Sequence, residues 1–190
     1  LDNTTPLYIL QRINHNVFMD VEGLMGNIEN AFEYLQDPEY TPIELLKTNA
    51  NKPYYKLDGN GYWRLMTYIN NTTAYDNAKD TGMAFQAGKV VGKFHQLLAN
   101  ASLENYVDTI PQFHDLSLRK NQFEESLTSA SKEKLATSKT AINFAKDTLE
   151  RLKILNNAEL PVRVCHNDTK LNNILFSKEN SKALCLIDLD

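Results

Sequence analysis

Three short apolar runs near the end of the chain constrain its fold more than any other feature. They cover residues 162–165, 173–176 and 183–187, and each has the length and composition of a strand. A loop rich in Asn and Asp separates the first two runs, and a polar turn at 177–182 separates the last two. We therefore expect a small β element whose last strand delivers Asp188 beside the polar loop.

The polar loop contains a pattern that is typical of phosphoryl transfer. His166, Asp168 and Asn173 fill the spacing His-x-Asp-x-x-x-x-Asn. An aspartate can accept the proton of an attacking hydroxyl, and an asparagine five residues later can reach a magnesium ion with its amide oxygen. Lys170 can place its ammonium group near the γ-phosphate of ATP, and His166 is expected to hold the loop. Taken alone, the pattern also fits an Asx-rich turn between two strands.

The acidic end of the last apolar run favours the first of these interpretations. Asp188 follows the run directly, and Asp190 lies two residues further on. A carboxylate at a strand end beside the loop can bridge magnesium and the phosphate oxygens of ATP. An acidic strand exit is common in itself, but here it coincides with the loop. The sequence therefore predicts an enzyme that uses ATP and Mg2+.

The rest of the chain changes from mostly β to mostly helical. Residues 1–70 predict a strand at 8–13, a helix capped by Asp20, a strand at 42–48 and a hairpin of 54–57 with 62–69. After the polar break 70–73, helices are expected at 82–99, near Asn121 and at 135–155. With the motifs, this order predicts an α+β, two-lobed protein-kinase-like fold that is partial at both ends. The N-terminal lobe would be residues 1–70 and the C-terminal lobe residues 71–190.

Two segments resemble known small-molecule kinases. Residues 164–176 and the ending Leu186-Ile187-Asp188-Leu189-Asp190 look like the aminoglycoside phosphotransferase and choline kinase superfamily. The run YILQRINHNVF at 8–18 and HNDTKL at 166–171 are similar to the N-acetylhexosamine 1-kinases. The resemblance implies transfer of the γ-phosphate to the anomeric 1-hydroxyl of an N-acetylhexosamine. The alternatives are another acceptor (choline or another amino alcohol, an aminoglycoside, a different sugar) or a non-catalytic nucleotide-binding domain of kinase shape.

The resemblance also assigns roles in the catalytic segment. Asp168 would be the base that acts on the sugar hydroxyl, and Asn173 and Asp188 would be the magnesium ligands. Asp190 would be either a second metal ligand or a contact to the substrate.

Near the start of the chain, the third strand of this family's fold normally supplies a lysine or arginine to the α- and β-phosphates. Gln11 and Arg12 compete for that position, and strand alternation lets only one of them face the nucleotide. We prefer Arg12 because it carries the charge; its carboxylate partner would be Glu22 or Glu29 on the following helix. His15 is a candidate contact to the sugar or else a surface histidine, and the backbone at 67–72 is expected to cradle adenine.

Composition limits the kinds of partner and the cell compartment that we expect for this protein. A net charge of −4, with both signs mixed along the chain, argues against a nucleic-acid partner. No apolar run approaches the roughly 20 residues that cross a bilayer, and residues 1–20 lack the pattern of a secretory signal. Cys165 and Cys185 are expected to be buried thiols in a reducing cytoplasm.

The chain also lacks parts of the family pattern. No glycine-rich hairpin precedes Tyr8, and the chain ends at Asp190 where the family continues into acceptor-binding helices. We expect an incomplete, poorly active chain with a tendency to associate with another copy through uncovered apolar faces.

Overall fold

The computed structural model describes residues 6–154 and 160–190. The chain divides into two compact units, which are described separately. The first comprises Leu1–Thr109 together with Arg163–Asp190, and the second is Ile110–Val162. Antiparallel sheets combined with helices confirm the α+β class. The predicted division into two lobes at residue 70 stays a prediction.

The first sheet of the larger unit is centred on β4 (Gly61–Thr67). Its neighbours, all antiparallel, are β1 (Tyr8–Ile13), β2 (Leu45–Leu46) and β3 (Tyr55–Leu57). The predicted hairpin is confirmed, since β3 and β4 are joined by a turn in which Gly59 and Gly61 have φ of 72° and 87°. Only glycine adopts such angles without steric cost. The register places Gln11 of β1 opposite Arg64 of the central strand β4.

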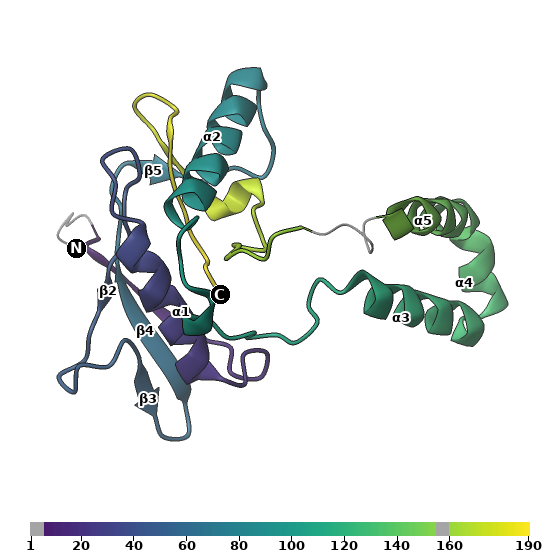
Figure 1. The fold of residues 1–190 in the computed structure, drawn as a ribbon, viewed down its shortest axis with the longest axis horizontal. Helices are drawn as coiled ribbons and strands as arrows, with labels where there is room; N and C mark the ends of the chain where they lie inside the picture. The colour runs from purple at the N-terminus through teal and green to yellow at the C-terminus, as the bar shows by residue number, and fades with distance from the viewer. Residues whose placement is uncertain (1–5, 155–159) are drawn as a thin grey trace, which may run out of the picture. The chain divides into compact units, whose positions relative to one another are not determined.

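Helix α1 (Val21–Tyr34) packs against this sheet (Figure 1). Asp20 caps it as predicted, because the Oδ1 atom accepts a hydrogen bond from the backbone of Gly23 at 2.8 Å. The apolar face of the helix and one strand residue form a buried cluster, which consists of Ile13, Val21, Leu24, Met25 and Ile28. Since side chains alternate along a strand, Gln11 projects to the same face of the sheet as Ile13.

The second sheet has the order β5-β6-β7, from β5 (Thr72–Thr73), β6 (Ile174–Ser177) and β7 (Ala183–Leu186). It packs against α2 (Thr81–Leu97) around buried Val90, Phe94, Phe176 and Leu186. The 3-10 turn η1 (Leu103–Asn105) follows α2, and η3 (Leu171–Asn173) leads into β6. Tyr40 ties the chain after α1 to β7, since its hydroxyl oxygen accepts a hydrogen bond from the amide of Leu186 at 3.0 Å.

The second unit contains α3 (Leu116–Ser129), α4 (Lys132–Thr137) and α5 (Lys139–Leu152). The helix predicted near Asn121 is therefore longer than expected, and the one predicted at 135–155 is split at Ser138. The residues expected on its buried side, Ile142, Ala145, Leu149 and Leu152, do share one face of α5, but they are only partly buried. No described residue of these three helices is fully buried.

Two predictions about strands were wrong, and a third was correct in kind but not in its bounds. The polar break at 70–73 contains strand β5, because Thr72 pairs with Ser177. The strand predicted at 42–48 is present but consists of only the two residues of β2. Residues 162–165 form no strand, and Cys165 is consequently exposed, whereas Cys185 is buried as predicted.

Candidate active site

The loop before β6 is closed by its own backbone. The amide of Lys170 donates to the carbonyl of Asp168, and that of Asn173 donates to the carbonyl of Lys170, both at 2.9 Å. Asn167 has a φ of 64°, a left-handed conformation that asparagine tolerates better than most residues. The short turn η3 then carries Asn173 into β6 with its side chain buried. Local hydrogen bonds therefore close the loop on itself.

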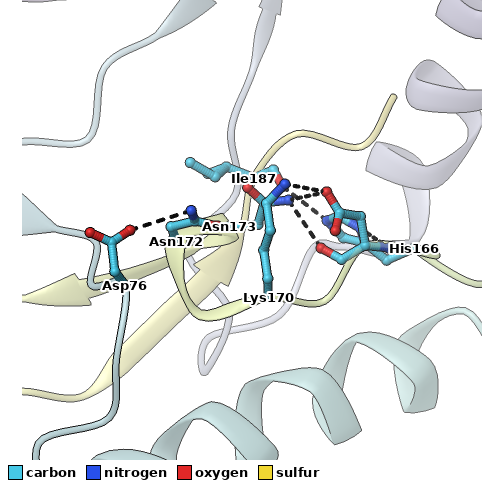
Figure 2. Close-up of polar contacts among 7 residues, drawn as sticks. Asp76, His166, Lys170, Asn172, Asn173 and Ile187 are labelled. Carbon is cyan, nitrogen blue, oxygen red and sulfur yellow. Dashed lines mark hydrogen bonds and ion pairs between the residues drawn. The ribbon is translucent and has the colours of Figure 1, made fainter. Parts of the chain in front are cut away.

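Asp168 is the centre of this loop, and Figure 2 shows the polar contacts in which Lys170 and Asn173 take part. Its Oδ2 atom accepts hydrogen bonds from Lys170 Nζ at 2.6 Å and from Asn173 Nδ2 at 3.1 Å. The hydrogen bond from Lys170 lowers the pKa of Asp168, and Asn173 contributes in the same direction. The bond to Asp168 in turn raises the pKa of Lys170. The carboxylate is thus ionised and, with 48% of the side chain exposed, accessible to a molecule in solution.

His166 holds the loop from behind. It is buried; its Nδ1 atom accepts from the amide of Asp168 at 3.4 Å, and Nε2 faces the carbonyl of Ile187 at 2.9 Å. A carbonyl only accepts, so Nε2 donates to it. The ring also contacts Phe94, with centroids 5.8 Å apart. These contacts fit the holding role predicted for His166.

Asp188 and Asp190 have different surroundings. The amide of Ile187 donates to the carbonyl of Asn173 at 2.9 Å, so the end of β7 lies beside the loop as expected. Asp188 is exposed, has a φ of 64°, and is close enough to Lys170 to raise the pKa of that ammonium group. Asp190 is largely buried, with its Oδ1 atom 2.5 Å from Arg64 NH2. Burial raises the pKa of Asp190, and the charge of Arg64 opposes that shift.

Arg64 was missed by the sequence reasoning. It lies in the middle of β4, is 3% exposed, and donates from Nε and NH2 to Gln11 Oε1 at 2.9 and 2.7 Å. A single arginine inside the otherwise uncharged run Tyr62-Trp63-Arg64-Leu65-Met66 was the signal that could have found it. Gln11, rather than the preferred Arg12, therefore lies on the side of Asp190; Arg12 is exposed and approaches Gly61 and His15.

The remaining predicted residues have partners away from the loop. Glu22 pairs with Lys52 at 3.6 Å and Glu29 with Lys47 at 2.9 Å. The His15 ring lies 5.6 Å from that of Tyr62. None of these recorded contacts involves residues 166–173, so their predicted roles toward nucleotide and sugar stay predictions.

The donor set beside the loop suits magnesium. Mg2+ prefers oxygen ligands and is commonly bound by one or two carboxylates together with substrate phosphates. Asn173 uses its amide nitrogen on Asp168, and no recorded hydrogen bond in the described part of the chain engages its amide oxygen. That oxygen and the exposed carboxylate of Asp188 fit the ion. No cluster of three or more His, Cys, Asp or Glu side chains able to hold a metal occurs among the described residues.

An ionised, accessible aspartate beside two oxygen donors suits phosphoryl transfer, which needs a positioned acceptor and neutralised charge. Comparison with known families agrees, because the model of the phosphotransferase enzyme family (APH) matches residues 44–190. This is more than half of the chain, which therefore belongs to that family. The match supports the superfamily predicted from sequence and implies the use of ATP. Over the ranges that the structure describes, no helix is both long and apolar enough to span a membrane.

Proposed function

We propose that this protein transfers the γ-phosphate of ATP to a hydroxyl group of a small molecule, the anomeric 1-hydroxyl of an N-acetylhexosamine. The observation that carries the proposal is the state of Asp168. Its carboxylate is ionised, half exposed and oriented by Lys170 and Asn173. Phosphoryl transfer depends mainly on positioning the acceptor and on neutralising developing charge, and this loop provides both kinds of group.

The proposal gives a role to four residues of the loop and to Asp188, which follows β7. Asp168 accepts the proton of the acceptor hydroxyl and aims the oxygen at the phosphate. Lys170, which is 52% exposed, can turn its ammonium group from Asp168 to a phosphate oxygen. Asn173 and Asp188 would hold Mg2+, which supplies positive charge to the β- and γ-phosphates when bound. His166 keeps the Asp168 backbone fixed during the reaction.

The choice of acceptor rests on the resemblance of residues 8–18 and 166–171 to N-acetylhexosamine 1-kinases. An amino alcohol, an aminoglycoside or another sugar is the second candidate, since the family match extends to phosphotransferases without naming an acceptor. A non-catalytic domain is disfavoured, because Asp168, Asn173 and Asp188 are all present and Asp168 is held in an ionised state.

The proposal is tested by incubating the protein with ATP, Mg2+ and a panel of acceptors. The panel should contain N-acetylglucosamine, N-acetylgalactosamine, unmodified hexoses, choline and an aminoglycoside, with products identified by 31P NMR. We expect a sugar 1-phosphate from the N-acetylhexosamines, and a loss of about 10³-fold or more in rate for Asp168→Asn while nucleotide binding survives. Phosphorylation of a different acceptor would replace the sugar assignment. Near-normal turnover by the variant would exclude Asp168 as the base.

A further inference from the structure

The segment that follows β7 is held at two points on either side of Asp188. Before it, Ile187 donates its amide to Asn173 and accepts from His166, each at 2.9 Å. After it, Asp190 pairs with Arg64 of the first sheet. Asp188 itself has a left-handed φ of 64°, which is uncommon for a residue other than glycine. A backbone conformation of this kind persists only where the surroundings impose it.

Arg64 is itself fixed in place. Its guanidinium group is nearly inaccessible, and two of its donors, on Nε and NH2, converge on Gln11 Oε1. Because a guanidinium group is planar, this fork sets the orientation of the whole group. NH2 also faces the Asp190 carboxylate. Gln11 and Arg64 are direct partners across the β1–β4 pair, so the sheet register determines the geometry.

We propose that Arg64, oriented by Gln11, is a positioning residue that holds Asp190 and thereby keeps Asp188 directed toward the catalytic loop. In this proposal the two acidic residues have different roles. Asp190 anchors the segment after β7 to the first sheet through Arg64, and Asp188 is the residue available to a ligand. The role of Asp188 toward Mg2+ rests on the proposed function, whereas the tie between Arg64 and Asp190 does not.

The energetic cost of burying Asp190 explains why its ion pair with Arg64 can hold the segment after β7. The Asp190 carboxyl group is only 14% exposed, and the guanidinium group of Arg64 beside it offsets part of the cost of burying it. Removal of Arg64 leaves that carboxyl group without its charged partner, and a movement toward water restores its hydration. Such a movement would carry the 187–190 backbone with it and release the left-handed conformation at Asp188.

The first measurement is hydrogen exchange of the free protein. In Arg64→Met we expect the amide of Ile187, which donates to Asn173, to exchange about tenfold faster, while those of α1 near Leu24 keep their protection. Arg64→Lys retains the charge without the fork and should give a smaller increase. If Arg64→Met does not fold, Gln11→Met removes only the fork and should still accelerate exchange at Ile187. Unchanged exchange in the folded variants would overturn the proposal.

The second measurement is the Mg2+ dependence of binding of a fluorescent ATP analogue. Loss of an outer partner of a metal ligand typically weakens metal affinity about 10- to 100-fold, so Arg64→Met should raise the half-saturating Mg2+ concentration by about this factor. Arg64→Lys should recover part of it, and Arg151→Met, at an exposed arginine in the last turn of α5, should leave it unchanged. If unaltered protein showed no Mg2+-dependent binding while the exchange result held, the proposed function would fail and the tie would stand. Faster exchange with an unchanged Mg2+ requirement would overturn the link to Asp188.

Discussion

The side chain of Asn173 donates from one nitrogen to two oxygens of Asp168, reaching the backbone carbonyl at 3.0 Å and the carboxylate at 3.1 Å. The amide nitrogen is therefore committed to the candidate base. The amide oxygen is left for a second task, and metal binding is the one that its chemistry suits. One side chain thus sets the distance between the base and the proposed metal site.

Replacement of Asn173 should affect both tasks. We expect Asn173→Ala to lower kcat/KM about 10- to 100-fold and to raise the Mg2+ concentration needed for half-maximal activity. Steady-state kinetics over a Mg2+ series measures both quantities. Asn180→Ala is the matched control, since Asn180 only accepts from the amide of Lys182 in the turn before β7. A normal Mg2+ requirement in Asn173→Ala would remove Asn173 from the metal site.

Lys170→Met should change the ionisation of Asp168. The ammonium group lowers the pKa of Asp168 below 3.8, so the stability linked to its ionisation is present above pH 3.8 and is lost as pH falls through the lowered folded value. Without Lys170 the folded pKa moves upward, and this contribution to stability becomes smaller. Titration of the Asp168 carboxyl carbon by NMR measures the midpoint. Lys178→Met, in the turn after β6, should leave it unchanged; the same midpoint in Lys170→Met would show that the ion pair has no influence in solution.

Tyr40→Phe tests the link between the segment after α1 and β7. The variant leaves the amide of Leu186 without its acceptor, and we expect a loss of about 1 kcal/mol in the free energy of unfolding. Denaturant titration measures this loss, and Tyr55→Phe, at an exposed tyrosine, is the control.

Tyr40 should also make the stability of the protein depend on pH in the alkaline range. Burial raises the pKa of Tyr40 above its ordinary 10.0, so its contribution to stability is present below pH 10 and is lost as the unfolded chain ionises above it. The stability of Tyr40→Phe should therefore fall less steeply above pH 10. An equally steep decline in both proteins would contradict this assignment.

Two glycines of α1 should respond oppositely to alanine. A Cβ atom at Gly23 would lie 2.6 Å from Val107 Cγ2 and closer still to the capping carboxylate of Asp20, whereas one at Gly26 would meet nothing within 4 Å. We expect Gly23→Ala to cost about 1–3 kcal/mol and Gly26→Ala to stabilise the protein by about 0.5–1 kcal/mol. Thermal and denaturant unfolding of the two variants provide the comparison. A neutral Gly23→Ala would mean that residues 103–107 do not pack against α1.

The two thiols should differ in reactivity. Cys165 is exposed, whereas burial raises the pKa of Cys185 to about 12 and removes its thiolate at neutral pH. Mass spectrometry after brief alkylation should find one label in the native protein and two after denaturation. Cys165→Ser should abolish the native label, and rapid labelling of Cys185 would show that β7 is not packed as described.

Much of this protein is specified by residues close together in sequence. Helix caps and turns involve groups at most a few residues apart. The cap of α1 by Asp20 and the turn between β3 and β4 are examples. The loop from His166 to Asn173 is likewise closed by short-range hydrogen bonds, so its spacing alone predicts where Asp168, Lys170 and Asn173 lie relative to one another.

Other features arise only from contacts between distant segments. Thr72 lies in strand β5 because it pairs with Ser177, and Cys165 is exposed because residues 162–165 form no strand. Whether Gln11 or Arg12 lies toward residues 166–173 depends on which face of β1 is turned to them. The alternation of side chains along a strand predicts that the two residues lie on opposite faces, but not which of the two faces residues 166–173. The folded chain places Gln11 opposite Arg64 and makes Arg64 the buried cation beside Asp190, whereas the contact of Gln11 or Arg12 with the nucleotide stays a prediction. Local sequence fixed the chemistry of the loop, whereas tertiary packing decided which charge lies behind it, because burying a carboxylate requires a partner that only the folded chain brings within reach.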